Sequence, residues 1–240
     1  MPLLIKAVIE YNDKGYLIHS SNYIGAYVRG RTKDEALNKF DKEIKQYIMW
    51  STGKKFCNKE KSEIQIVQEK KSNLQICDAD SDVLFESEKF PLNIDEYKKL
   101  KLLVMKSAND FKALYDSIPD KHQTSLNPRK TFYGEIPRTA NEMYTHANNV
   151  VSYYIREIGI NINNLPDISE NRINALKSVE AMPVLLENQI FDGSCDEQWT
   201  LRKVLRRFIW HDRIHAKAMY RMAVDIWGIH QIKNPFFFEL

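Results

Sequence analysis

The chain has 240 residues, which is enough for one large domain or two small ones. Hydrophobic residues make up 43% of it, and only 8 Gly and 8 Pro are present, so the composition excludes a disordered or collagen-like protein. The 35 Lys and Arg residues against 32 Asp and Glu give a net charge of +3, too small by itself to indicate a nucleic-acid-binding protein.

Three features of the sequence bear on location. The N-terminal segment lacks the apolar stretch of a signal peptide and becomes polar at Glu10. No run of 18 apolar residues occurs, so we expect no membrane-spanning segment. The three cysteines, Cys57, Cys77 and Cys195, form no CxxC pair and are typical of free thiols in a reducing compartment. Together these features predict a cytoplasmic protein that does not enter a membrane.

Residues 1–91 have a mainly strand-like pattern. The expected strands lie at 3–11, 16–20, 26–29, 63–68, 74–77 and 83–86. One helix is expected after the third strand. It begins at Thr32, where Glu35 completes a capping box, and its buried side carries Leu37, Phe40 and Ile44. The pattern predicts a small sheet covered by one helix.

The periodicity becomes helical from residue 93 onward. Four helices are expected, at 93–118, 139–159, 169–189 and 200–227. Asn93 with Glu96 and Thr139 with Glu142 provide caps for the first two, and Pro183 is expected to bend the third. A long polar loop separates the first helix from the second.

The predicted fold class is therefore α+β. A sheet-plus-helix domain is expected at 1–91, and an all-α four-helix bundle at 92–240.

The last predicted helix carries a candidate metal site. His211 and His215 are four residues apart, which puts both imidazoles on one helical face, one turn apart. That face is otherwise apolar, and buried imidazoles need partners for their nitrogens. Hydrogen bonds to buried acceptors or a metal ion would each supply them. His146, at the flank of the apolar stripe of the second helix, is a candidate third ligand.

Seven cations occupy the other side of this helix: Arg202, Lys203, Arg206, Arg207, Arg213, Lys217 and Arg221. Such a face is usually solvated or paired with acids of another domain, and nucleic acid is the less favoured partner. Trp210 lies among the cations. An aromatic residue there indicates a covered surface, where the first domain could dock.

The segments IPRTANEMYTHANNV and DEQWTLRKVLRRFIWHDRIHAKAMYRM resemble the DinB-like (DinB/YfiT) metal-binding superfamily. The resemblance implies a four-helix bundle that holds one divalent transition metal ion, zinc or nickel by preference, on His146, His211 and His215. Members of the superfamily include transferases and isomerases that use low-molecular-weight thiols, so a small thiol is an implied cofactor. Asp212 and Glu142 are candidates to orient the ligand imidazoles.

The segment EYNDKGYLIHSSNYIGAYVRGRTKDEALNKFDKEIKQYI resembles the HicB-like antitoxin fold. This resemblance implies a small sheet with one covering helix that binds a protein partner. The DNA-binding segment that such proteins often carry is not evident, and helices follow instead. We therefore favour a docking or dimerisation role for residues 1–91. His19, alone on a predicted strand, is expected at the surface.

Two functions remain open at this point. The first is a metal-dependent enzyme, a hydrolase or a small-thiol-dependent transferase, acting on an unidentified small molecule at an open three-histidine site. The second is a non-catalytic binding protein in which residues 1–91 recognise a protein partner, as an antitoxin does, and the metal only stabilises the bundle. Three protein ligands favour chemistry, whereas a fourth would favour a structural ion. A homodimer is compatible with both functions.

Overall fold

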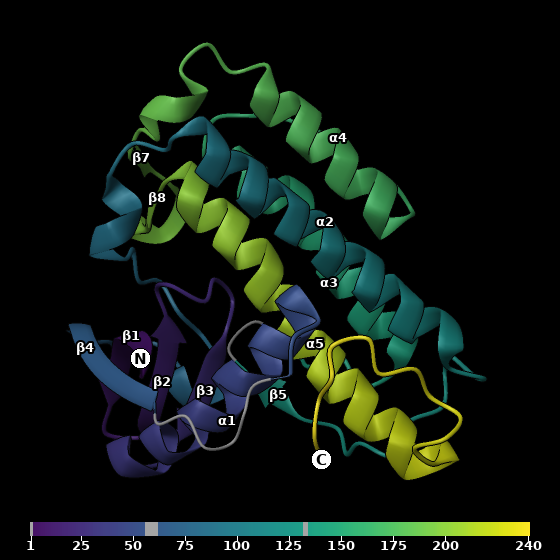
Figure 1. Ribbon diagram of the computed structural model, residues 1–240. Helices are drawn as coiled ribbons and strands as arrows, with labels where there is room; N and C mark the ends of the chain where they lie inside the picture. The colour runs from purple at the N-terminus through teal and green to yellow at the C-terminus, as the bar shows by residue number, and fades with distance from the viewer. Residues whose placement is uncertain (1, 56–61, 132–133) are drawn as a thin grey trace.

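The computed structural model describes residues 2–55, 62–131 and 134–240. Within these ranges a sheet with one long helix comes first, and four long helices follow (Figure 1). The α+β class is therefore confirmed. Cys57 lies outside the described residues. No described helix combines the length and apolar character that crossing a membrane requires.

The N-terminal sheet has the strand order β3-β2-β1-β4. The strands are β1 (Leu3–Asn12), β2 (Gly15–Ser20), β3 (Tyr27–Gly30) and β4 (Ser62–Lys71). Strand β1 pairs antiparallel with β2 through a tight turn and parallel with β4 at the edge. All four strands lie where the sequence predicts them, although β4 is longer than expected.

Helix α1 (Lys33–Thr52) covers one face of this sheet. The hydroxyl of Thr32 accepts a hydrogen bond from the backbone N–H of Glu35, so the predicted cap is present. Phe40 and Ile44 are buried against the sheet, while Leu37 is only half-buried. The helix thus packs its apolar side against the sheet to form a core within residues 2–55.

The two remaining predicted strands are wrong. Residues 74–77 lead into a short 3-10 helix, η1 (Ile76–Asp78), because the Asn12 and Asp80 side chains bond backbone groups at Leu74 and Gln75 that a strand would pair. Residues 83–86 lead into a second one, η2 (Glu86–Lys89). Side chains elsewhere in the fold, described below, bind the backbone of that second segment in place of a neighbouring strand.

The four later helices are α2 (Ile94–Ser117), α3 (Ala140–Arg156), α4 (Ile168–Glu180) and α5 (Leu201–Trp227). Helix α2 contacts the other three, and α3 contacts both α4 and α5. Helix α4 ends at Glu180, well before the predicted end at 189. It does not bend at Pro183 but stops ahead of it, because a proline disfavours helical geometry in the residue before it. The polar loop at 119–137 contains two short paired strands, β5 (Lys130–Thr131) and β6 (Gly134–Glu135).

Helix α5 joins the two parts of the molecule. Apolar residues of the sheet, of α1 and of all four later helices belong to one buried cluster. Four of the seven cations on α5 are buried: Lys203, Arg206, Arg207 and Arg213. Arg206 donates to the carbonyl of Val83 and to Glu88. The side chain of Gln68 bonds the carbonyl of Leu84 and the N–H of Glu86, so side chains satisfy backbone groups of residues 83–86 that a strand ladder would pair. The prediction of a covered face is confirmed. The domain boundary at residue 91 stays a prediction.

Candidate metal centre

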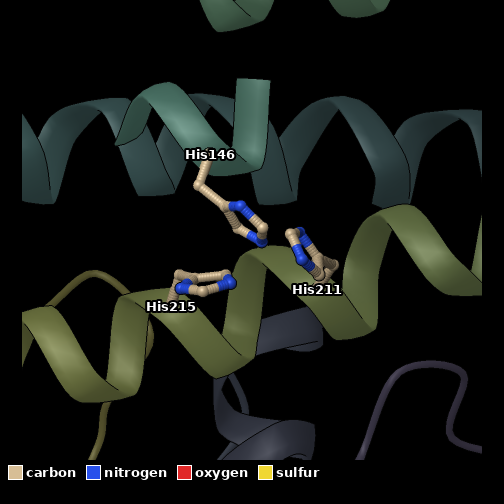
Figure 2. Close-up of side chains that lie close together, drawn as sticks. All are labelled: His146, His211 and His215. Atoms are coloured by element: carbon tan, nitrogen blue, oxygen red, sulfur yellow. The ribbon is translucent and has the colours of Figure 1, made fainter. Parts of the chain in front are cut away.

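The three predicted ligands come together between α3 and α5 (Figure 2). One ring nitrogen from each of His146, His211 and His215 can be chosen so that all three lie within 4.8 Å of one another. The ring centroids are 5.0 Å apart for His146 and His211, 4.8 Å for His146 and His215, and 4.5 Å for His211 and His215. Each side chain is thus within reach of a single ion.

Apolar contacts between α3 and α5 place these side chains. On α3, Met143, Ala147 and Val151 are buried beside His146; on α5, Phe208 and Met219 are buried on either side of the histidine pair. Burial of these apolar side chains stabilises the packing of α3 against α5, which places the histidines side by side. The site is held by the fold.

The surroundings keep the imidazoles neutral. Burial and, to a smaller extent, the neighbouring His146 together lower the pKa of His215 to about 3. Desolvation of the ring by surrounding protein atoms also lowers the pKa of His211 and of His146, and His215 and His146 add to the effect on His211. Neutral imidazole is the form that binds metal ions. The buried Nδ1 of His211 has no hydrogen-bond partner among the described residues, so the donor set fits a divalent transition metal ion.

One side of the site is open to solvent. His146 is exposed and His215 is half-buried, whereas His211 is only 9% exposed. Within the described chain, no Cys, Asp, Glu or further His joins the group. His230 is exposed and lies beyond the end of α5. Three protein ligands leave room for water or substrate on the ion.

The two carboxylates expected to orient an imidazole have other partners. Oδ1 of Asp212 accepts a hydrogen bond from Nη2 of Arg172 at 3.1 Å. The carboxylate of Glu142 accepts from the backbone N–H groups of Arg138 and Thr139, at 2.7 and 3.1 Å, and these bonds lower its pKa. Glu142 therefore acts as the predicted helix cap, and Asp212 faces α4.

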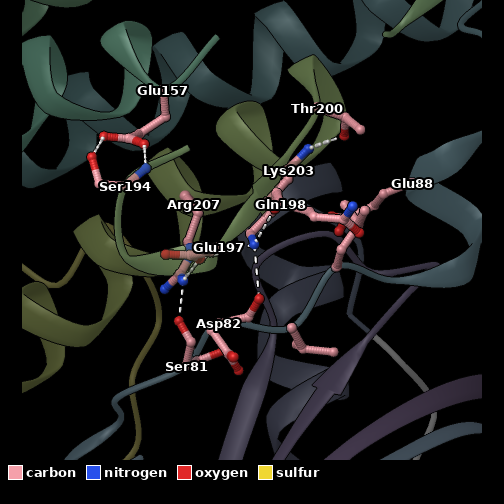
Figure 3. A network of polar contacts seen from close by, with 12 residues as sticks. Ser81, Asp82, Glu88, Glu157, Ser194, Glu197, Gln198, Thr200, Lys203 and Arg207 are labelled. Carbon is pink, nitrogen blue, oxygen red and sulfur yellow. Dashed lines mark hydrogen bonds and ion pairs between the residues drawn. The ribbon is translucent and has the colours of Figure 1, made fainter. Parts of the chain in front are cut away.

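A buried polar network precedes the site on α5, and its partners could not be read from the sequence (Figure 3). Arg207, one turn before His211, donates to Glu197 at 2.7 Å and to the carbonyl of Ser81. Nζ of Lys203 donates to the carbonyls of Asp82 and Gln198 and also contacts Glu197. The sequence signals for such a contact were the excess of cations on this helix and the presence of Trp210 among them. The network ties the first turns of α5 to the N-terminal part.

Aromatic residues close the inner side of the site. The ring of Tyr154 stands edge-on to that of His211, with 6.0 Å between the ring centroids. The ring of Phe208 packs against Tyr154, with 5.8 Å between their centroids. Tyr154 is only 6% exposed, and burial raises its pKa to about 12. The wall next to His211 is therefore uncharged near neutral pH.

Comparison of the chain with protein-family models, with curated proteins and with solved structures found no match in any of the three. The two family resemblances accordingly stay predictions, and the three-histidine geometry is the main guide to function.

Proposed function

We propose that the protein is a metal-dependent enzyme with one divalent ion held by His146, His211 and His215. The observation that carries this proposal is the convergence of three neutral imidazoles, within 4.8 Å of one another, at a place where His146 is exposed to solvent. A small molecule could reach an ion at this place directly.

The reaction class follows from the donor set. His146, His211 and His215 would hold the ion, which would lower the pKa of a water molecule or of a small thiol at this place. Hydrolysis and thiol-dependent group transfer are the two corresponding reactions. The protein contributes neutral ligands and an apolar inner wall, which excludes water from the side of His211 that faces Tyr154 and Phe208. Zinc and nickel both suit such ligands.

The arrangement of helices supports the finer fold proposal. We infer that α2, α3, α4 and α5 form a four-helix bundle of the DinB-like kind. The contacts among these helices and the positions of the three ligands agree with this inference. The HicB-like fold proposed for residues 1–91 is supported by the small sheet in this part of the chain and by the position of α1 against it.

The rival proposal is a protein that binds a partner through residues 1–91. Trp210 of α5 packs against His19 of β2 and Tyr27 of β3, so part of the sheet's second face already holds a segment of the same chain. This contact favours an internal docking role for the first part. A protein partner or a second copy would have to bind outside the area that Trp210 covers.

An open coordination position is what separates an enzyme from a structural metal protein. We would load the full chain with Co²⁺ and titrate it with 2-mercaptoethanol and, separately, with azide. The proposal expects a thiolate-to-cobalt charge-transfer band and an azide-dependent change in the visible spectrum. His122→Ala, which removes an exposed histidine outside the site, should behave as the wild type does, and His215→Ala should show neither change. If neither 2-mercaptoethanol nor azide changes the visible spectrum of the Co²⁺-loaded wild type, the ion has no open coordination position and the site is structural.

A further inference from the structure

Helix α4 carries two polar residues where its apolar stripe should continue. The stripe is formed by the buried residues Ile168, Ala175, Leu176 and Val179. Asn171 and Arg172 stand three and four residues after Ile168, at the positions that a regular stripe would fill with apolar side chains. Both are 0% exposed. Each has its partner on a different helix of the metal centre.

Asn171 binds α3. Its Nδ2 donates to the backbone carbonyl of Asn148 at 3.1 Å and to the side-chain Oδ1 of Asn148 at 2.8 Å. Asn148 in turn donates to the carbonyls of Leu165 and Pro166, which precede α4. Asn148 lies two residues after the ligand His146. The turn of α3 that carries this ligand is therefore bonded to α4.

Arg172 binds α5. Its Nη2 donates to Oδ1 of Asp212 at 3.1 Å, and its guanidinium carbon lies 3.8 Å from the centre of the Phe208 ring. Asp212 directly follows the ligand His211, and Phe208 precedes that ligand by three residues. Arg172 thus contacts α5 on both sides of His211.

Stability alone does not account for these polar residues. Nε and Nη1 of Arg172 and Oδ2 of Asp212 have no hydrogen-bond partner among the described residues, although the whole pair is buried. Burial of such an ion pair carries a large desolvation cost, and well-packed apolar replacements are often neutral or stabilising. Hydrogen bonds differ from apolar contacts in requiring a particular distance and direction. The hydrogen bonds of Asn171 and Arg172 therefore favour one particular placement of α3 and α5 relative to α4.

We propose that Asn171 and Arg172 form a polar clamp that sets the spacing and register of α3 and α5, and so preorganises the three histidines for one metal ion. These two are positioning residues, since they act through the helices that bear the ligands. The inference rests on the proposed function, because it requires a metal ion at the triad. It adds a role for α4, which contributes no ligand.

The test replaces the ion pair by apolar side chains, as Arg172→Met with Asp212→Leu in the full chain. The readouts are the melting temperature of metal-free protein, the Co²⁺ spectrum, and the Zn²⁺ affinity from competition with a chelator. We expect a melting temperature close to or above that of the wild type, a changed Co²⁺ spectrum, and a loss of Zn²⁺ affinity of about 10- to 100-fold. Asn171→Leu should lower the affinity in the same direction.

Helix α5 also takes part in a second buried ion pair, which provides a matched control. Arg206 and Glu88 form a pair that is as buried as Arg172 and Asp212, but it joins α5 to the N-terminal part. Arg206→Met with Glu88→Leu should change the melting temperature and leave the Zn²⁺ affinity and the Co²⁺ spectrum of the folded protein unchanged.

The outcomes separate the clamp from the proposed function. Wild-type protein that binds neither Zn²⁺ nor Co²⁺ overturns both. Wild-type binding together with unaltered affinity and spectrum in the folded Arg172→Met, Asp212→Leu variant overturns the clamp alone. Should that variant not fold, Arg172→Lys decides, because it keeps the positive charge but lacks the planar group over Phe208. We expect it to weaken Zn²⁺ binding several-fold, and wild-type affinity would contradict the clamp.

Discussion

Trp210 and His211 are consecutive on α5, yet they contact opposite parts of the molecule. The ring of His211 lies 5.0 Å from that of His146 on α3, and the ring of Trp210 lies 5.5 Å from that of His19 on β2. One helix therefore presents the metal ligands on one face and the contact with the N-terminal sheet on the other. The N-terminal sheet therefore covers the side of α5 that lies opposite the histidines.

This arrangement predicts that residues 92–240 depend on the first part for stability. Without it, Trp210 would be exposed, and Arg206 and Arg213 would lose Glu88 and Glu43. The apolar surface of α5 around Trp210 would also face water, so the hydrophobic stabilisation from its burial would be lost. We expect the 92–240 fragment to melt at a lower temperature than the full chain, as followed by circular dichroism. A fragment that matches the full chain in melting temperature and in Zn²⁺ affinity would show two independent domains.

The C-terminal segment packs at the junction between α5 and the N-terminal part of the chain. Phe236 is 0% exposed and stacks on Trp50 of α1 at 5.5 Å, close to the guanidinium of Arg213. We expect Phe236→Ala to lower the free energy of unfolding by about 3–5 kcal/mol, because it leaves a cavity at this contact.

The neighbouring residue provides the control for that change. Phe237 is 43% exposed, so Phe237→Ala should change the free energy of unfolding by no more than about 0.5 kcal/mol. Urea denaturation of both variants measures the difference. Equal effects of the two substitutions would mean that the C-terminal segment does not hold the junction.

Glu10 gives the junction a pH dependence. It is fully buried, lies 3.3 Å from Nε2 of His19 and accepts a hydrogen bond from Ser81. Burial raises its pKa, but the bonds to His19 and Ser81 and the charges nearby lower it by more, from an ordinary value of 4.5 to about 2. Because the folded-state pKa is the lower one, the carboxylate stabilises the fold above pH 4.5, and that stabilisation is lost as the pH falls toward 2.

Glu10→Gln tests this dependence. At pH 7 we expect it to lower the free energy of unfolding by about 1–3 kcal/mol, the cost of breaking a buried hydrogen-bonded charge network. Between pH 4.5 and 2 the difference from wild type should shrink, because the wild-type side chain becomes neutral there too. Urea titrations at a series of pH values measure it, and a difference that stays constant over this range would be incompatible with the lowered pKa.

The helices could be predicted from the sequence because their signals are local. A cap at Thr32, Asn93 or Thr139 and a stripe of period 3.6 are properties of a few neighbouring residues, and all three helices begin there. The strands predicted at 74–77 and 83–86 were wrong for the complementary reason. Strand-forming residues indicate an extended chain, but a ladder also needs a neighbour, and here side chains of distant residues take its place.

For the metal site too, features set by neighbouring residues could be predicted, and features set by contacts between distant segments could not. The spacing of His211 and His215 was sufficient to place both on one face, whereas their approach to His146 depends on how α3 packs against α5. His19 was expected at the surface and is 1% exposed, because Trp210 and Phe85 cover it. No pattern within one strand reveals such a cover. The roles of Asp212 and Arg172 were hidden for the same reason.

An ion in a preformed scaffold should contribute little to folding. The apolar residues around the triad, such as Ala147, Val151 and Phe208, are buried, and their burial stabilises the helices whether or not an ion is bound. We therefore expect a chelator to lower the melting temperature of metal-loaded wild-type protein only modestly, in proportion to metal affinity, and to leave its circular dichroism spectrum at room temperature unchanged. Unfolding on chelation would mean that the ion is structural, as it is in zinc fingers.

The central claim is that one divalent ion binds to His146, His211 and His215, and elemental analysis of untagged protein tests it most directly. Wild-type protein and His122→Ala, each incubated with Zn²⁺ or Ni²⁺ and then desalted, should carry close to one equivalent of metal per chain. The His146→Ala, His211→Ala and His215→Ala proteins should fold and carry almost none. Wild-type protein that retains neither metal at neutral pH, or a His215→Ala variant that retains a full equivalent, would contradict the account.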